Sequence, residues 1–498
     1  MRGYSQRVLR THRTRRLVGA AAAVAFVSAV AALGAWAAYA WWESRLPGSY
    51  NVMDFGVVEA GGGPGAADHR AHSGVSIAGL EGPQGKPDVR FTLTAKKATV
   101  RLSSGRTVDA LTFDGRLPGP ELRVRRGDLV EVTLVNEDIG DGVSIHWHGV
   151  DVPNAEDGVS GVTQDAVRPG QRYTYRFRPD QAGTFWYHTH QDSARNVARG
   201  LYGPLVILPE RAQTTGFDFT AVIHNFSGVD ALGESDQPER RAVPPGTDVR
   251  LRLVNSDSLT RRFILSGTPF RVAAIDGTDV QGPTLVSGKR LELGAGGRYD
   301  VVFRMPEEPV RLGLADSPVA LTFSRSGRVE LPPVRFDRVF DPAAYGTPKP
   351  APSRFDRTFE LDIDRSLGFL DGGFGYQWTT NGRVFPDTPV YSVRQGELVK
   401  MKISNGSGDV HPMHLHGHHV RVLSRDGAPV RGSPWWVDTL NVAEGEEYEV
   451  AFRTDNPGVW MLHCHILSHA ADGLTMHLAY EGYRTPFEIG GDAGNAPE

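Results

Sequence analysis

The chain contains an internal repeat, which limits its possible folds more than any other feature. The stretch Val167–Phe177 is similar to Val442–Phe452, and matching glycine, aromatic and histidine residues in and beyond these stretches keep one offset of 275. A middle copy starts at Pro245–Val249 and closes at Gly296–Phe303. Three similar copies in a chain of 498 residues predict three similar domains.

Within each copy, apolar and polar residues alternate in short runs that turn residues separate, as in Leu129–Val135. This period of two indicates β-strands, and the 58 glycines and 33 prolines favour a turn-rich β architecture over a helix bundle. We therefore predict an all-β chain of three Greek-key β-sandwich domains. They cover residues 90–210, 211–345 and 354–485, called the first, middle and third repeat below.

The N-terminal part differs from the repeats. Residues 1–16 carry six arginines and no acid, whereas residues 17–40 carry no charge. This uncharged stretch can cross a bilayer core of about 30 Å, which predicts a basic cytoplasmic arm (1–16) and a hydrophobic transmembrane helix (17–42). The alternative is an export signal cleaved after Ala38–Ala40. The body then lies on the extracytoplasmic face of the cell membrane, or is secreted if cleavage occurs.

Two segments beside the repeats show little pattern. Residues 43–89 are Gly-rich, which predicts a flexible linker, and the residues from about Gly490 onward predict a loose tail.

Composition excludes several classes of protein. Cys464 is the only cysteine, so a disulfide-stapled fold and a multi-cysteine zinc site are both excluded. Beyond its basic arm the chain is acidic, and it therefore offers no basic field for nucleic acid.

The histidines form four His-x-His pairs, two in the first repeat and two in the third. They are His146 with His148, His188 with His190, His414 with His416, and His463 with His465. On a strand, residues i and i+2 point to the same face, so each pair directs two imidazoles at one point. Neutral imidazole binds copper, zinc, iron and nickel. Because eight imidazoles are too many for one ion, we predict a cluster of several metal ions between the first and third repeats.

A second site follows from the same alternation. Cys464 lies between His463 and His465 and must face the opposite side of their strand. His411 differs in parity from His414 and so can meet Cys464 there, while His469 lies beyond the strand end and can return to this site. Two imidazoles and one thiolate are the ligands of a blue-copper electron-transfer site.

These motifs resemble those of the three-domain, laccase-like multicopper oxidases of bacteria. They are His146-Trp-His-Gly149, His188-Thr-His190, His411-Pro-Met-His-Leu-His-Gly417 and His463-Cys-His-Ile-Leu-Ser-His469. The resemblance covers roughly residues 90–485. It implies cupredoxin domains and a copper-dependent enzyme with O2 as acceptor. In this family a small donor, such as a phenol, is oxidised one electron at a time at a type 1 copper. A trinuclear copper cluster then reduces O2 to water with four electrons.

The resemblance also implies the ligands of four copper ions. The type 1 copper takes His411, Cys464 and His469, and the type 2 copper takes His146 and His414. The type 3 pair takes the remaining six: His148, His188, His190, His416, His463 and His465. Cys464 is a predicted catalytic residue. So is Asp157, which matches an acidic residue near the type 2 copper that orients ligands and relays protons; the alternative is a plain Asp-Gly turn.

The chain departs from the family pattern at two places. The axial type 1 position holds Leu474, which provides no ligand atom, and we expect Met476 to face away from the copper. Some relatives carry a further carboxylate just after the cysteine motif, but Leu467 and Ala470 stand there, which leaves Asp472 as a weak substitute.

Two other functions stay open. The chain could oxidise Fe(II) or Cu(I) in metal homeostasis, although its seven methionines are scattered and form no Cu(I)-binding cluster. It could also be a non-catalytic copper-binding protein, against which the complete set of ten motif histidines and Cys464 argues.

Overall fold

The computed structural model describes residues 3–63, 74–211 and 216–498, with only the backbone described for residues 3–19. The chain divides into two compact units. One contains Met1–Pro47 and Ser366–Gln377, and the other contains Gly48–Arg365 and Trp378–Glu498.

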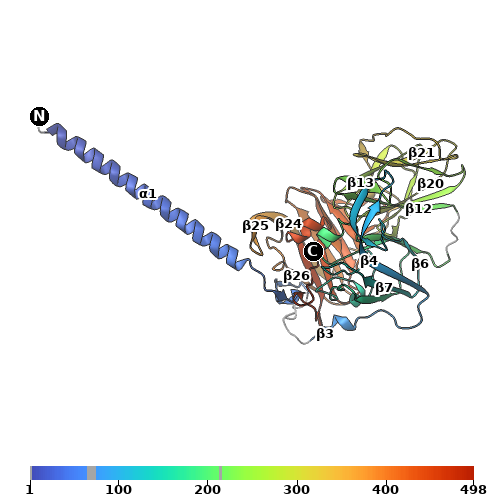
Figure 1. Cartoon of the computed structure of the whole chain (residues 1–498), viewed down its shortest axis with the longest axis horizontal. Helices are drawn as coiled ribbons and strands as arrows, with labels where there is room; N and C mark the ends of the chain where they lie inside the picture. Colours follow the sequence, from blue (N-terminus) through green and yellow to red (C-terminus); the bar gives the residue numbers. More distant parts are fainter. Residues whose placement is uncertain (1–2, 64–73, 212–215) are drawn as a thin grey trace. The chain divides into compact units, whose positions relative to one another are not determined.

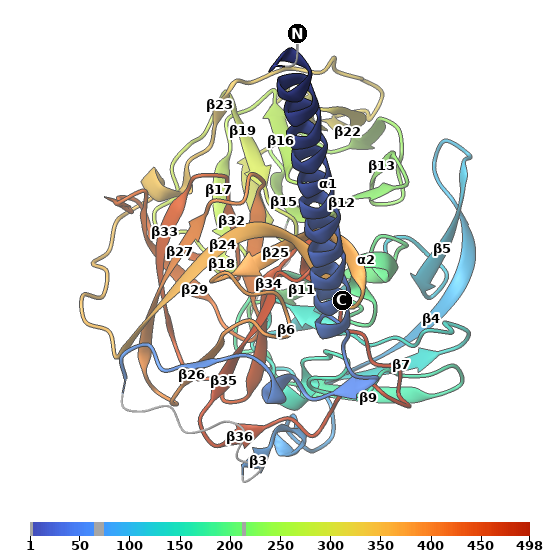
Figure 2. The same ribbon diagram turned by 90° about the vertical axis from the view of Figure 1, so that its left-hand side faces the viewer.

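Apart from two two-stranded sheets, the described strands form three pairs of sheets, which Figure 2 shows in blue-green, green-yellow and orange-red. In the first repeat, the sheets are β5 (Thr107–Phe113), β4 (Val89–Arg101), β7 (Val130–Asn136) and β9 (Arg172–Phe177), and β6 (Leu122–Arg125), β11 (Tyr202–Leu208), β10 (Gly183–His188) and β8 (His146–His148). In the middle repeat they are β13 (Val229–Leu232), β12 (Phe217–Phe226), β15 (Asp248–Asn255), β20 (Arg298–Arg304), β17 (Arg271–Ile275) and β18 (Thr278–Asp279), and β14 (Glu239–Ala242), β22 (Ser317–Ser324), β21 (Val310–Leu314), β16 (Arg261–Ser266), β19 (Lys289–Leu293) and β23 (Arg338–Val339).

The third repeat has the largest sheets. One contains β25 (Gly373–Thr380), β24 (Arg357–Leu370), β27 (Leu398–Asn405), β33 (Glu447–Arg453), β29 (Val420–Arg425) and β30 (Ala428–Pro429), with β31 (Trp435–Val437) paired to β29. The other contains β2 (Val58–Glu59), β26 (Val390–Val393), β35 (Thr475–Tyr480), β34 (Val459–Cys464), β28 (His411–Leu415) and β32 (Thr439–Val442). Short helical turns are α2 (Ser193–Asn196), α3 (Leu467–Ala471), η1 (Val52–Asp54), η2 (Ile77–Gly79), η3 (Asn154–Glu156) and η4 (Pro342–Ala344).

The same pairing recurs in each repeat. β7, β15 and β27 each run parallel to the first long strand of their repeat, which is β4, β12 or β24. Each also runs antiparallel to the strand that carries the repeated tyrosine, which is β9, β20 or β33. The recurrence confirms the predicted all-β fold of related sandwiches.

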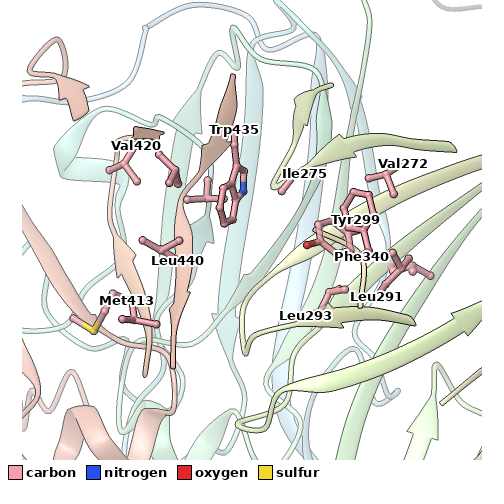
Figure 3. Packing of buried hydrophobic residues seen from close by; sticks show 14 of the residues in the cluster. Val272, Ile275, Leu291, Leu293, Tyr299, Phe340, Met413, Val420, Trp435 and Leu440 are labelled. Carbon is pink, nitrogen blue, oxygen red and sulfur yellow. The ribbon is translucent and has the colours of Figure 1, made fainter. Parts of the chain in front are cut away.

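Alternation of the side chains explains the burial. In β7, Val130, Val132 and Leu134 are buried and the residues between them are partly exposed. The middle and third repeats share one continuous apolar core, part of which Figure 3 shows around Tyr299 and Trp435. The first repeat has a core of its own.

The smaller unit contains α1 (Gly3–Glu43), the long blue helix of Figure 1. One helix thus runs through both the predicted basic arm and the predicted anchor. Its residues Ala20–Glu43 are long and apolar enough to cross a membrane, and this stretch is exposed to solvent. The predicted N-terminal hydrophobic helix is therefore present.

The segment 43–89 differs from the expected flexible linker, apart from residues 64–73, which lie outside the described residues. β2 joins a sheet of the third repeat, and β3 (Val75–Ser76) pairs with β36 (Tyr483–Arg484). Val52, Met53 and Ile77 are buried in a small core with residues of the first and third repeats. A few apolar residues thus pack this segment against the first and third repeats. The average composition of the segment does not reveal them.

The expected loose tail is also wrong. β37 (Ile489–Gly490) pairs with β1 (Ser49–Tyr50), and Asn495 is 3% exposed. The Asn495 amide donates to the carboxylate of Asp165 (2.8 Å) and to the carbonyl of Glu488 (2.8 Å). Specific hydrogen bonds therefore fix a segment that lacks hydrophobic pattern.

The buried position of Ile77 gives a test of this structural role. Ile77→Ala removes a fully buried side chain at the seam of two repeats and should destabilise the fold by about 2–5 kcal/mol. Val75→Ala, at a 60% exposed site of the same segment, should cost no more than about 0.5 kcal/mol. Thermal unfolding followed by calorimetry compares the two, and equal effects would support a flexible linker.

Candidate metal centres

The eight paired histidines lie at or just beyond the ends of four strands, two from the first repeat and two from the third. In the first repeat, β8 and β10 pair His146 with His188. In the third repeat, β28 and β34 pair His414 with His463 and Met413 with Cys464. The strand register therefore puts the cysteine on the opposite face from the two histidines beside it, as the alternation predicts.

All eight imidazoles come together in the fold. The Nε2 atoms of His146 and His414 are 3.4 Å apart, and one comes from each repeat. His190, His416 and His463 form a group whose ligand atoms all lie within 4.8 Å of one another. The remaining three rings, of His148, His188 and His465, have centroids 4.8–5.8 Å apart. The cluster thus contains one pair and two triplets of imidazoles.

The outer ring nitrogens have fixed partners. The Nδ1–H groups of His146, His188 and His414 donate to the carbonyls of Asp157, Thr189 and Asp438, each at 2.9 Å. His148 is reversed, because its Nε2 lies 2.9 Å from Thr439 Oγ1.

Several of the ring nitrogens that point into the cluster lack hydrogen-bond partners. His148 Nδ1 and the Nε2 atoms of His188, His190 and His465 are buried and have no hydrogen-bond partner. Burial lowers the pKa of these histidines, so the rings are neutral and can donate a lone pair. In His148, His188 and His190 the outer nitrogen has a partner while the inner one has none, which is the arrangement that metal ions require; in His465 both nitrogens lack a partner. The residues therefore fit a metal cluster.

Asp157 lies directly behind this cluster. It is 1% exposed, and its Oδ2 accepts from His416 Nδ1 at 3.0 Å while its Oδ1 lies 3.1 Å from His146 Nδ1. One carboxylate thus contacts the outer sides of two rings, one from each repeat. These contacts favour a carboxylate that orients imidazoles over a plain Asp-Gly turn.

The second predicted group also assembles. Cys464 Sγ lies 3.5 Å from His411 Nδ1 and 4.0 Å from His469 Nδ1, and the two Nδ1 atoms are 3.2 Å apart. Ser407 Oγ lies 2.7 Å from His411 Nε2 and fixes the outer side of that ring. Burial lowers the pKa of His411 to about 4 and raises the pKa of the Cys464 thiol. A thiolate here therefore requires a bound cation.

Leu474 stands at the sequence position where the resemblance implies an axial ligand. It is fully buried, and its carbonyl accepts from the N–H of Cys464 at 3.1 Å. The expected orientation of Met476 is wrong. Its register partner is Leu462, which shares a face with Cys464, so Met476 points to the same side one residue pair further along the strands.

Trp378 is a residue of this second group that the sequence did not reveal. Its ring packs 4.3 Å from that of His469 and 4.7 Å from that of His411, and it is 8% exposed. Trp435, another buried tryptophan of the third repeat, packs against Tyr448. Trp378 belongs to no motif, so only the fold identifies it.

The middle repeat contributes a buried cation to the histidine cluster. The Arg298 guanidinium forms two hydrogen bonds to the Asp438 carboxylate, at 2.6 and 2.5 Å, and both side chains are fully buried. Asp438 Oδ1 lies 3.1 Å from His148 Nε2. The corresponding residue of the first repeat, Arg172, is exposed, so the sequence carried no signal for this role.

Besides Asp157 and Asp438, a third acid beside the cluster is Glu498. The Glu498 carboxylate lies 3.0 Å from His463 Nδ1 and also contacts Ser193 Oγ, and its side chain is 9% exposed. The carbonyl of Pro497 accepts from His190 Nδ1 at 3.0 Å. Two rings of one triplet thus depend on this segment. Asp472, the substitute expected from the sequence, instead lies at the end of α3, where its carbonyl accepts from the N–H of Trp378.

Comparison with known proteins agrees with this geometry. Two family models, both described as multicopper oxidase, match residues 94–212 and 360–482. The multicopper oxidase MmcO of Mycobacterium tuberculosis is 28% identical over 469 residues, which cover 80% of this chain and 88% of that protein. Laccase-1 of Botryotinia fuckeliana is 26% identical, with 78% and 82% covered. The crystal structure of a multi-copper oxidase from Pseudomonas thermotolerans matches with a TM-score of 0.65 and 27% identity, over 79% of this chain and 99% of that one.

The contact between Glu498 and His463 leads to a prediction on metal retention. Glu498→Ala removes the acid behind one imidazole, and loss of such a partner weakens metal affinity by roughly 10–100-fold. Asp492→Asn removes a charge from an exposed site of the same segment and should change nothing. Metal content after dialysis against graded chelator, measured by mass spectrometry, separates the two. Equal retention in both variants would show that Glu498 has no positioning role.

Proposed function

The chain belongs to the multicopper oxidase family, and from this premise we propose which of its residues serve each step. It is a copper-dependent oxidoreductase that uses four copper ions, a reducing substrate and O2. When bound, the copper ions supply one-electron redox chemistry, by which four electrons and four protons convert one O2 into two waters.

Electrons enter at the group of His411, Cys464 and His469. The single observation that carries the proposal is this convergence of one thiol and two imidazoles behind the histidine cluster. The thiolate of Cys464 and the two Nδ1 atoms hold the entry copper, and Ser407 keeps the ring of His411 in place. His469 is the partly exposed member of the group, so the donor meets the protein at its ring edge.

Cys464 also provides the connection to the oxygen site. It is bonded through the backbone to His463 and His465, whose side chains point to the opposite face. His463 belongs to one triplet of imidazoles and His465 to the other. One residue therefore links the entry site to both halves of the cluster.

The histidine cluster holds the other three copper ions. We assign the pair His146 and His414 to the type 2 copper. One type 3 copper is held by His190, His416 and His463, and the other by His148, His188 and His465. Asp157 is the positioning residue shared by the pair and one triplet, since it contacts His146 and His416. In this division the first repeat (90–210) and the third (354–485) share the cluster. The middle repeat (211–345) holds no copper and supports the site through Arg298.

For the donor we propose phenols or similar small reductants. Relatives include laccases, and the only partly exposed ring of the entry group, His469, is held in place by the buried ring of Trp378. Oxidation of Fe(II) or Cu(I) is the second candidate. A relative from Epichloe festucae is named an iron transport multicopper oxidase, and the charge of Asp409 acts on both His411 and His469. An acidic group beside the entry site suits a metal cation.

We further propose that α1 anchors the chain, with its body on the extracytoplasmic face of the membrane. The support is the length of Ala20–Glu43, its exposed apolar surface, and the basic residues that precede it.

Cys464→Ser tests the proposed entry site. Serine lacks the thiolate, so the thiolate-to-copper absorption band should disappear and donor oxidation should fall to background. The histidine cluster should keep its copper. Absorption spectra, metal content and O2 uptake measure the three effects, and unchanged turnover of the variant would refute the assignment.

The donor class is decided by steady-state rates with a phenol, Fe(II) and Cu(I) under one set of conditions. We expect the highest kcat/KM with the phenol. A clear preference for either metal ion would favour metal oxidation over phenol oxidation. If none of the three donors supports O2 uptake, the natural donor belongs to a different class.

The anchor is tested by fractionating cells that express the full chain. We expect the protein in the membrane fraction after a high-salt wash, with residues 1–42 still present by mass spectrometry. A soluble protein that begins after Ala40 would establish the cleaved export signal instead.

A further inference from the structure

A hairpin in the third repeat exposes three large apolar side chains close together in the sequence. Outside α1, Phe374 and Tyr376 are the only exposed aromatic residues among the described ones, at 62% and 67%. Leu367, on the opposite strand of the hairpin, is 59% exposed. The ring of Phe369 lies 5.0 Å from that of Phe374. We define these four side chains, which all lie within Ser366–Gln377, as the hairpin patch.

The hairpin is joined to the end of α1, and both belong to the smaller unit. The N–H of Asp371 donates to the carbonyl of Ser44 at 3.0 Å, and the N–H of Gly372 donates to Ser44 Oγ at 3.1 Å. The Asp371 carboxylate accepts from the N–H of Leu46 and pairs with the guanidinium of Arg45 at 3.3 Å. These contacts tie the tip of the hairpin to the residues that directly follow the helix (Figure 1).

The turn itself is built for close approach. Asp371 and Gly372 have φ of 43° and 79°, the left-handed values of a tight two-residue hairpin turn. A Cβ atom on Gly372 would lie 3.0 Å from Trp41 Nε1. The tip therefore packs directly against the aromatic end of α1, where Trp41 and Trp42 are 41% and 71% exposed.

From this arrangement we propose that the hairpin patch binds the interfacial region of the lipid bilayer beside the anchor. Tryptophan and tyrosine favour the headgroup level of a bilayer, and Trp41 and Trp42 stand at that end of the apolar helix. Phe374 and Tyr376 of the patch add two aromatic side chains beside Trp41 and Trp42, because their hairpin is hydrogen-bonded to the residues that follow the same helix end. A water-exposed position would leave several large apolar side chains solvated at one place.

This proposal rests on the proposed membrane anchor and adds a second point of attachment to it. A helix alone leaves the following chain free to rotate and tilt. A hairpin that inserts aromatic side chains next to the helix end fixes the smaller unit at a defined depth.

Site-specific fluorescence on the full chain tests the proposal. Cys464 is buried, so an environment-sensitive thiol dye attached to Phe374→Cys reports the patch with little background. The protein is reconstituted into phosphatidylcholine–phosphatidylglycerol vesicles that contain lipids with a nitroxide quencher near the headgroup. The matched control is Leu259→Cys, an exposed apolar site of the middle repeat at 57%.

We expect strong quenching and a blue-shifted emission at position 374, and neither effect at position 259. The double variant Phe369→Ser/Tyr376→Ser should reduce the quenching at position 374, because the patch then loses its apolar neighbours. Equal quenching at positions 374 and 259, in vesicles that carry the protein, would overturn the proposal and leave the anchor intact.

Flotation of the vesicles on a density gradient reports the anchor separately. If the uncleaved protein does not float with the vesicles, the anchor is wrong and the proposal falls with it. A blue shift that appears in detergent and grows with protein concentration would identify a second copy of the chain as the occupant, which also overturns binding to lipid.

Discussion

The structure depends on the alternation of side chains along β34. Because successive residues point to opposite faces, His463 and Cys464 serve two different sites at a separation of one peptide unit. The neighbouring strand β28 has the same alternation, since His414 stands opposite His463 and Met413 opposite Cys464. A slip of one residue would exchange the two faces and abolish both sites together. The remaining architecture keeps this register and brings the facing half of the cluster to it.

That facing half comes from another repeat, so the site exists only while the seam between the first and third repeats is closed. Several buried contacts serve this purpose. The Asn154 amide exchanges two hydrogen bonds with the backbone of Val459, at 2.9 and 3.1 Å. Asp157 contacts one ring from each side, and the segments around Ile77 and Glu498 pack over the same seam. The middle repeat contributes Arg298, whose buried guanidinium pairs with Asp438 of the third repeat.

The sequence was informative wherever chemistry is repeated at short spacing. The His-x-His pairs, the position of Cys464 between two histidines and the offset between repeats each follow from local pattern, and the strands place them as parity requires. Long-range packing was not predictable. Glu498 contacts the histidine cluster and Trp378 contacts the entry site, but neither residue lies in a motif, so only the folded chain brings them there. Likewise, the Gly-rich composition of segment 43–89 predicts a flexible linker. The segment is nevertheless packed, because a few of its residues, such as Ile77, are buried, and an average composition does not show them.

We propose that ten histidines and one cysteine of this chain form an entry site for electrons and a cluster of three copper ions. The most direct test is the copper content of the purified full chain after removal of loosely bound metal. We predict about four copper ions per chain. One ion per chain would leave the histidine cluster without a metal and contradict the account, and so would none.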